Sequence, residues 1–192
     1  MESGRSLIWK WQNNEVADRR YVLAKIWFPY DHNTERTSYM SAENVREYLK
    51  GKGLEGRITV HKGTIDTVEH AAQQVGCSEG EIAKTLSFVV DGKPVLVVMS
   101  GDMRISNPKF KSQFHAKPSM IPYDRVDEMI GQKPGGVCPF AVKEGVSVYL
   151  DVSMKRFEIV HPAAGSEFTS VSLTLHELES ACGAAGWCDV CK

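Results

Sequence analysis

The sequence predicts an α+β (mixed α/β) fold in which helices flank a mixed β-sheet. Apolar residues recur at helical spacing in several segments that end at glycine, such as residues 68–76. Between two such segments, the β-rich runs 86–90 and 95–99 are joined by Asp91-Gly92-Lys93-Pro94, which is typical of a hairpin turn. Both runs are nearly all apolar. We therefore expect a central hairpin in a sheet that is not purely parallel.

Capping residues and glycines mark the remaining elements. The capping boxes Ser78-x-x-Glu81 and Thr174-x-x-Glu177 open, respectively, a short helix that carries Ile82 to Lys84 and the last helix. Ser41 can cap a helix that ends at Gly51. Further helices are expected over residues 68–75, from Asn107 through Phe114, and over 123–130. Further strands are expected over residues 57–61, 146–150, 157–161 and 168–173.

Composition excludes several classes of protein. The chain of 192 residues has 23 Lys and Arg against 24 Asp and Glu, a net charge of −1, which excludes a polybasic DNA coater. No apolar run reaches the roughly 18 to 20 residues that cross a bilayer, and no secretory signal is evident, so we expect a cytoplasmic protein without membrane contact. Five cysteines at irregular spacing argue against a secreted disulfide framework.

The chain divides into two unequal parts. Residues 1–39 hold three of the four tryptophans, show no sustained period and stop before Met40-Ser41, which looks like a natural start. We interpret them as an N-terminal extension or an added leader. Residues 40–192 amount to one domain.

Three features could carry chemistry. Lys84 lies between apolar segments, where an ammonium either reaches solvent along its stem or binds an anion. The loop Gly135-Gly136-Val137-Cys138-Pro139 could aim successive N–H groups at one point, as in an oxyanion hole, or be a plain turn. In Ser100-Gly101-Asp102, a glycine ends a buried strand where backbone could approach a ligand closely.

In this order and spacing, these pieces resemble the YbaK/ProX family of aminoacyl-tRNA editing domains over Met40 to Lys192. The resemblance rests on five segments, which are Ile82-Ala83-Lys84-Thr85-Leu86, the strand from Val95 to Asp102, Gly135 to Pro139, Val148-Tyr149-Leu150-Asp151, and Pro162 to Ser166. It implies a curled, largely antiparallel mixed sheet or barrel with flanking helices.

The resemblance also implies an activity and its residues. The activity is that of a free-standing trans-editing hydrolase, which cleaves the ester joining a wrong amino acid to the terminal adenosine of a tRNA, such as cysteinyl-tRNA(Pro) or another small amino acid on a tRNA. Catalysis would rest on Lys84, Gly135 and Gly136. The substrate-binding residues would be Thr85, Gly101, Asp102, Val137, Cys138, Pro139, Asp151 and Gly165. A synthetase is a further candidate partner, and no cofactor is implied.

The cysteines leave alternatives open. Many relatives carry serine where this chain has Cys138, so this thiol is either a nucleophile or, as we favour, part of the pocket lining. The pair Cys188-x-x-Cys191 could be half of a zinc site with Cys182 and His176, but a lone pair of this kind is a weak signal, and we expect no metal.

A local basic stretch is the candidate contact for the tRNA acceptor stem. Residues 102–117 contain four basic residues and one acidic residue, Asp102. The basic residues are Arg104, Lys109, Lys111 and Lys117. The alternative is a solvated helix face. A non-catalytic module that binds tRNA or a synthetase is the alternative to an enzyme.

Overall fold

The structure is a computed structural model that describes residues 34–192, with side chains from Ser41 onward. Its first element, α2 (Thr34–Gly51), crosses the predicted boundary between residues 39 and 40 without a break. Ser41 therefore lies within the helix, where it is buried, and does not cap it as predicted. The tryptophan-rich part of the expected N-terminal extension lies outside the described residues, and its status stays a prediction.

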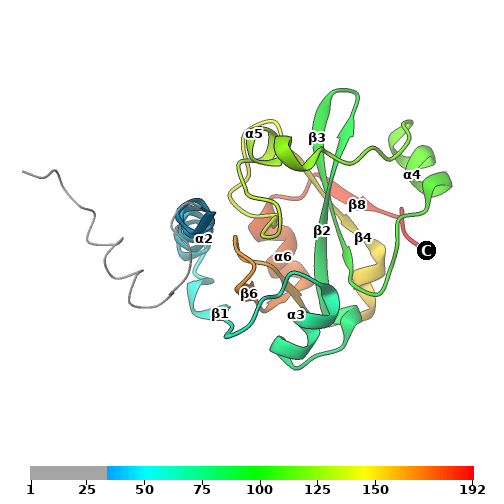
Figure 1. Ribbon diagram of the computed structural model, residues 1–192. Coiled ribbons are helices and arrows are strands. Elements are labelled where there is room, and N and C mark those ends of the chain that lie inside the picture. The colour runs from blue at the N-terminus through cyan, green and yellow to red at the C-terminus, as the bar shows by residue number, and fades with distance from the viewer. Residues whose placement is uncertain (1–33) are drawn as a thin grey trace, which may run out of the picture. The chain divides into compact units, whose positions relative to one another are not determined.

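A curled six-stranded sheet forms the centre of the fold, with the strand order β7-β5-β2-β3-β4-β8 (Figure 1). The predicted hairpin is its longest pairing, between β2 (Ile82–Val90) and β3 (Lys93–Ser100). The mixed sheet is confirmed, because β2–β5, β3–β4 and β4–β8 are parallel whereas β2–β3 and β5–β7 are antiparallel. The outer strands are β4 (Ser147–Asp151), β5 (Ile159–Pro162), β7 (Leu173–Thr174) and β8 (Gly186–Cys188).

A second, two-stranded sheet pairs β1 (Ile58–Val60) with β6 (Thr169–Val171). The sequence predicted one strand over residues 168–173, but the chain divides there between the two sheets, so that β6 pairs with β1 and β7 with β5. Sequence reasoning also missed β8, which is only three residues long.

The helices follow the predictions with two differences. α3 (Val68–Val75), α4 (Asn107–Phe114) and α6 (Leu175–Cys182) lie where expected, whereas residues 123–130 begin as a 3₁₀ turn and continue as α5 (Val126–Ile130). The capping box at Ser78 is present, but it opens only the 3₁₀ turn Glu79–Glu81. The next residues are in β2 rather than a helix, because Ile82 and Ala83 pair with β5. Lys84 is therefore a strand residue.

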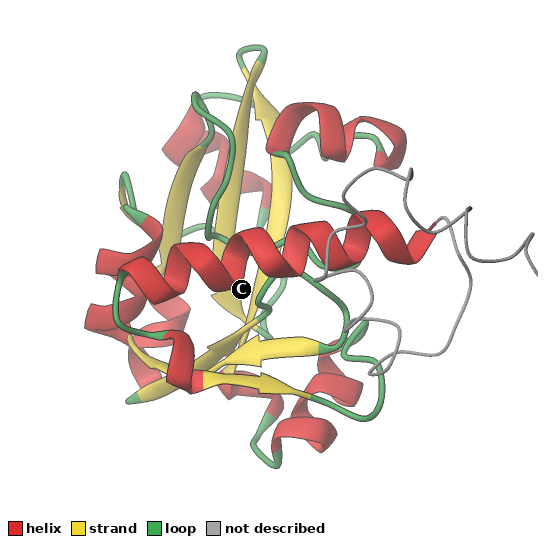
Figure 2. Ribbon diagram, turned by 90° about the vertical axis from the view of Figure 1, so that its left-hand side faces the viewer, coloured by secondary structure: helices red, strands yellow, loops and turns green. Residues whose placement is uncertain are grey.

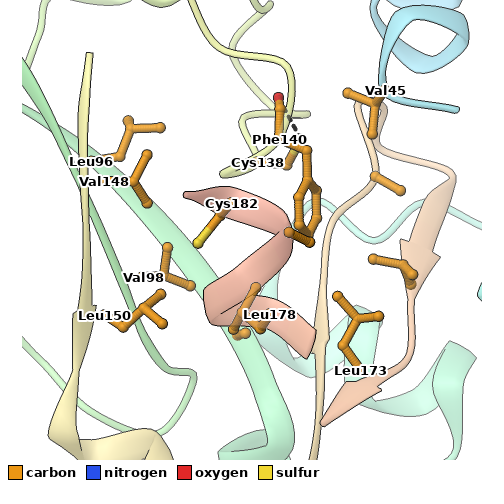
Figure 3. Packing of buried hydrophobic residues seen from close by; sticks show 14 of the residues in the cluster. Val45, Leu96, Val98, Cys138, Phe140, Val148, Leu150, Leu173, Leu178 and Cys182 are labelled. Atoms are coloured by element: carbon orange, nitrogen blue, oxygen red, sulfur yellow. Dashed lines mark hydrogen bonds between the residues drawn. The ribbon is translucent and has the colours of Figure 1, made fainter. Parts of the chain in front are cut away.

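The central hairpin has a different apolar cluster on each face, as the alternation of side chains requires. On one face, Leu96 and Val98 pack with α2, α6 and the segment that contains Phe140 (Figure 3). On the other face, Phe88, Val97 and Met99 pack with α4 and the C-terminal segment. Figure 1 shows α4 and the C-terminus on the opposite side of the hairpin from α2, and Figure 2 shows α2 crossing in front of the strands. Within residues 34–192, no helix has the length and apolar character that a membrane span needs.

Candidate active site around Lys84 and the glycine loop

The side chain of Lys84 is held by the end of the neighbouring strand. Its Nζ donates hydrogen bonds to the carbonyl oxygens of Gly101, at 2.8 Å, and of Met103; we call these two oxygens the carbonyl cage. Burial lowers the pKa of this half-buried lysine, and the nearby Cys191 and Asp102 act in the opposite direction. An ammonium has three donors. Two are used by the cage, so one is left for a ligand.

The edge of β2 has a gap beside Lys84. β2 pairs with β5 only through its first two residues, and further along the same edge Ser87 and Val89 bond to residues 119–121. Between these contacts, Thr85 has no strand partner on this edge within the described chain, and its buried Oγ1 also has no hydrogen-bond partner there. Lys84 and Thr85 are adjacent in a strand, so their side chains flank the gap from opposite faces of the sheet.

The glycine loop packs against the segment Pro162 to Ser166, which also carries the family resemblance. Gly135 has a φ of +92°, which favours glycine. A Cβ on Gly136 would lie 2.8 Å from Cα of Ser166, and a Cβ on Gly165 would lie 2.7 Å from the carbonyl oxygen of Ser41. The fold therefore brings these two loops together beside α2. Lys84 is not part of this contact, because its side chain lies on the other face of the hairpin.

The donors that the loop can offer are two backbone N–H groups. The N–H of Gly136 donates to the carbonyl oxygen of Lys133, and that of Cys138 donates to Oε1 of Gln132. The N–H groups of Gly135 and Val137 have no protein acceptor in the described part of the structure. They are the candidates for an oxyanion hole.

Sequence reasoning missed Gln132, which joins the two ends of this loop. Its side chain is fully buried, its Oε1 accepts the N–H of Cys138 at 2.7 Å, and its Nε2 donates to the carbonyl oxygen of Phe140 at 2.5 Å. A buried amide is stable only when its groups are paired, as they are here. A glutamine that follows a glycine forms no recognisable motif, so the sequence alone carries no signal that Gln132 holds the loop.

Cys138 is fully buried, which argues against both roles considered for its side chain. The thiol lies in the core beside Phe140, and Figure 3 shows the two residues side by side. Burial raises the pKa of the thiol to about 12. A neutral, inaccessible thiol is a poor nucleophile and does not line an open pocket. Cys138 instead helps to hold the loop, because its backbone N–H donates to Oε1 of Gln132. The side chain of the following residue, Pro139, is also buried.

Gly101 and Asp102 have structural partners. A Cβ on Gly101 would lie 2.2 Å from the carbonyl oxygen of Glu79. The space where a Cβ would lie is therefore filled by protein, so packing requires glycine here. The predicted closeness of Gly101 to the substrate stays a prediction. The carboxylate of Asp102 is paired with the guanidinium of Arg156 at 2.6 Å, and this hydrogen bond lowers its pKa.

Asp151 is fully buried and bound to backbone. Its Oδ1 accepts the N–H of Ser153 at 2.9 Å, and its Oδ2 accepts the N–H of Val190 at 2.8 Å. It borders a small pocket of about 220 Å³ together with Lys109 and Cys191. Because both carboxylate oxygens have protein partners, this arrangement indicates a role in holding the chain.

All four residues of the predicted basic stretch are exposed. They lie in α4 or in the segments on either side of it, on the face of the hairpin toward which Lys84 points. Lys109 forms an ion pair with Asp189 at 2.7 Å. Contact of Arg104, Lys109, Lys111 and Lys117 with tRNA stays a prediction.

Two histidines that the sequence analysis did not assign lie near each other. His161 of β5 pairs with Ile82 of β2, and its Nδ1 lies 3.0 Å from Oγ of Ser172. His61 is buried, and its Nε2 lies 2.7 Å from Oγ of Ser170. Burial lowers the pKa of both histidines. If both imidazoles were charged they would repel each other, and this repulsion also lowers the pKa of His161.

We expect the free energy of unfolding to decrease as the pH falls below about 6.5, the pKa of histidine in an unfolded chain. Because the pKa of His61 and His161 is lower in the fold, the unfolded chain binds protons first and is favoured in this range. Urea unfolding at a series of pH values would measure the effect. His161→Gln should flatten the profile, whereas His176→Gln, at an exposed position, should leave it unchanged. A wild-type profile that is flat from pH 7 to pH 5 would contradict this prediction.

Cysteines of the C-terminal pair are buried as well. Burial raises the pKa of Cys188 to about 12 and also raises that of Cys191. Among the residues with described side chains, no three His, Cys, Asp or Glu residues gather in a way that could hold a metal ion.

The fold and site thus define a mixed-sheet domain with a caged lysine and a glycine loop. Residues 62–181 match the aminoacyl-tRNA editing domain. YwhH of Bacillus subtilis (strain 168), a protein described as uncharacterized, is 41% identical over 154 residues, which cover 80% of this chain and 98% of YwhH. The chain therefore belongs to the aminoacyl-tRNA editing domain family.

The chain is also similar to two proteins whose descriptions name the enzyme that attaches proline to tRNA. The proline–tRNA ligase of Bacillus subtilis (strain 168) is 29% identical over 108 residues, which are 56% of this chain but only 19% of the ligase. A crystal structure of a candidate trans-editing enzyme for prolyl tRNA synthetase superimposes with a TM-score of 0.72 at 27% identity, covering 79% of this chain and 97% of that one.

Proposed function

We propose that this protein is a trans-editing hydrolase that cleaves the ester between a mischarged amino acid and the terminal adenosine of a tRNA. The observation that carries the proposal is the caged Lys84, an ammonium with one unused donor beside the gap in β2, in a chain of the editing-domain family. The match covers 98% of YwhH, so YwhH consists almost entirely of the part that it shares with this chain. The existence of such a relative as a separate protein supports action in trans.

In the proposed reaction, Lys84 binds a phosphate or ribose oxygen of the terminal adenosine as a point charge. The substrate would extend across the gap at the edge of β2, so that the N–H groups of Gly135 and Val137, on the other face of the sheet from Lys84, donate to the ester carbonyl oxygen as it becomes negative. The oxygen of a water molecule forms a bond to the carbonyl carbon. The carbon–oxygen bond to the ribose then breaks, and the ribose oxygen leaves with a proton from that water. An aminoacyl ester is already activated, so orientation and oxyanion stabilisation suffice without a strong base.

The tRNA(Pro) carrying a small wrong amino acid, such as cysteine or alanine, is the proposed substrate. The likeness to proline–tRNA ligases and to a candidate trans-editing enzyme for prolyl tRNA synthetase supports this choice. The exposed basic residues around α4 would contact phosphates of the acceptor stem. A synthetase is a further proposed partner.

The test is to incubate the protein with cysteinyl-, alanyl-, seryl- and prolyl-tRNA(Pro) and to follow loss of the ester. We expect turnover of a mischarged tRNA but not of prolyl-tRNA(Pro). Lys84→Ala should lower kcat/KM by about 100-fold or more, because a charged donor to the substrate is lost.

Lys143→Ala is the matched control. Its Nζ also donates to two backbone carbonyl oxygens, those of Asp127 and Glu128, but it does so at α5. We expect Lys143→Ala to retain activity. Binding of tRNA without any turnover would replace the enzyme with a non-catalytic binding module, and full activity of Lys84→Ala would rule out the proposed role of Lys84.

A further inference from the structure

The carbonyl cage of Lys84 belongs to a segment that is itself paired with the C-terminal end of the chain. Both cage oxygens lie in the stretch that leaves β3, at Gly101 and Met103. Immediately after Met103, Arg104 and Lys192 exchange two backbone hydrogen bonds, of 3.1 and 2.9 Å, and the N–H of Ser106 donates to the carbonyl oxygen of Val190 at 2.8 Å. Residues 104–106 and 190–192 thus form a short antiparallel pair.

Asp151 anchors this pair to the sheet. Its carboxylate is fully buried at the end of β4 and accepts the N–H groups of Ser153 and Val190. Hydrogen bonds to a charged acceptor are stronger than those between neutral groups, so this carboxylate fixes where Val190 lies. Val190 in turn fixes Ser106.

The side chains of the segment also lie against the lysine's strand neighbours. Cys191 is buried, and its Sγ lies 3.7 Å from Sδ of Met99, the residue that pairs with Lys84 across the hairpin. The segment therefore contacts both the backbone that directly follows the cage, at Arg104 and Ser106, and the sheet face on which Lys84 lies.

We infer that Asp151 and the C-terminal segment 188–192 position Lys84, by holding the loop whose carbonyl oxygens cage its ammonium. Asp151 is then a positioning residue and does not contact the substrate. This inference rests on the proposed function of Lys84 in binding the terminal nucleotide. The inference also gives the Cys188-x-x-Cys191 motif a structural role, because both free cysteines are buried and pack the segment against the sheet.

The first test is a double-mutant cycle on the affinity for uncharged tRNA(Pro) at fixed salt. Asp151→Asn keeps the shape of the side chain but removes an acceptor from the N–H of Val190. We expect it to weaken binding by about tenfold in the wild-type background, comparable to the loss of one charge-assisted hydrogen bond. In the Lys84→Ala background it should have almost no effect, because the residue through which it acts is absent.

Two further variants keep the test decisive. Deletion of Cys191 and Lys192 removes the pairing with Arg104 and leaves Asp151 in place, so it should reproduce the coupling if Asp151→Asn fails to fold. Asp189→Asn is the matched control in the same segment, since Asp189 has an exposed ion pair with Lys109. Its effect should be equal in both backgrounds.

A second measurement does not depend on activity or tRNA binding. Asp151→Asn should speed hydrogen exchange at the amides of Arg104 and Ser106, which donate to Lys192 and Val190. Unchanged exchange, or an equal loss of tRNA affinity with and without Lys84, would overturn the inference. If instead Lys84→Ala itself leaves tRNA affinity and ester hydrolysis unchanged, the proposed function of Lys84 fails, whatever the exchange shows.

Discussion

Replacing Gly101 with alanine should destabilise the fold by about 3 kcal/mol or more. The added Cβ would lie 2.2 Å from the carbonyl oxygen of Glu79 and 2.7 Å from Cγ1 of Val68. The nearer atom belongs to the backbone and cannot rotate away, so β3 or the turn before β2 must shift. Urea unfolding would measure the loss.

Gly56→Ala is the matched control for this substitution. A Cβ at Gly56 meets no heavy atom within 4 Å, and its φ is not in the left-handed region, so the change should stay within about 0.5 kcal/mol. The shift caused by Gly101→Ala should also displace the Gly101 carbonyl oxygen from Lys84, so activity should fall even at temperatures where the variant is folded. Equal stability of the two variants would contradict this packing.

Phe140→Ala should cost about 3 to 5 kcal/mol, the usual range for deleting a buried phenylalanine ring. The ring is fully buried and belongs to the core cluster that Val45, Leu173 and Leu178 share (Figure 3). The helix α2 and the consecutive elements β7 and α6, which are distant from α2 in the sequence, therefore lose a common packing partner. Such a loss is a large fraction of the roughly 5 to 15 kcal/mol that stabilises a typical domain.

Tyr123→Ala provides the comparison, because the Tyr123 ring is 78% exposed and its removal should change stability by less than about 0.5 kcal/mol. Both variants would be followed by denaturant unfolding, with the slope of the transition checked for a change in compactness. A cost below about 1 kcal/mol for Phe140→Ala would show that the cluster relaxes around the lost ring.

Local patterns were sufficient to predict most elements but not how they meet. The helix at residues 68–75 and the β2–β3 hairpin are encoded by residues near each other, namely helical spacing with a terminal glycine and Asp91-Gly92 between apolar runs. The capping box at Ser78 was interpreted wrongly, because strand pairing of Ile82 outweighed a local helical preference. Propensity is a weak guide wherever tertiary pairing competes with it.

The candidate site was predictable to a similar degree. Lys84 and the glycine loop were singled out from their residue types and from the family resemblance. The burial of Cys138, the bonds of Gln132 and the anchoring by Asp151 depend on residues distant in the sequence. Val190, for example, lies 39 residues from the carboxylate that it contacts. No local pattern reports such partners.

The order of strands in the sheet has a kinetic consequence. Among the strands of the six-stranded sheet, β2 and β3 are joined by a tight turn, whereas their parallel neighbours, β5 on β2 and β4 on β3, come from much later in the chain. Closing such long loops costs entropy before any contact repays it, so these pairings form slowly relative to a hairpin. The gap beside Thr85 acquires one of its two borders only when β5 docks. During refolding, protection of the amides of β2 and β3 that pair within the hairpin should therefore appear before that of the amides bordering the gap.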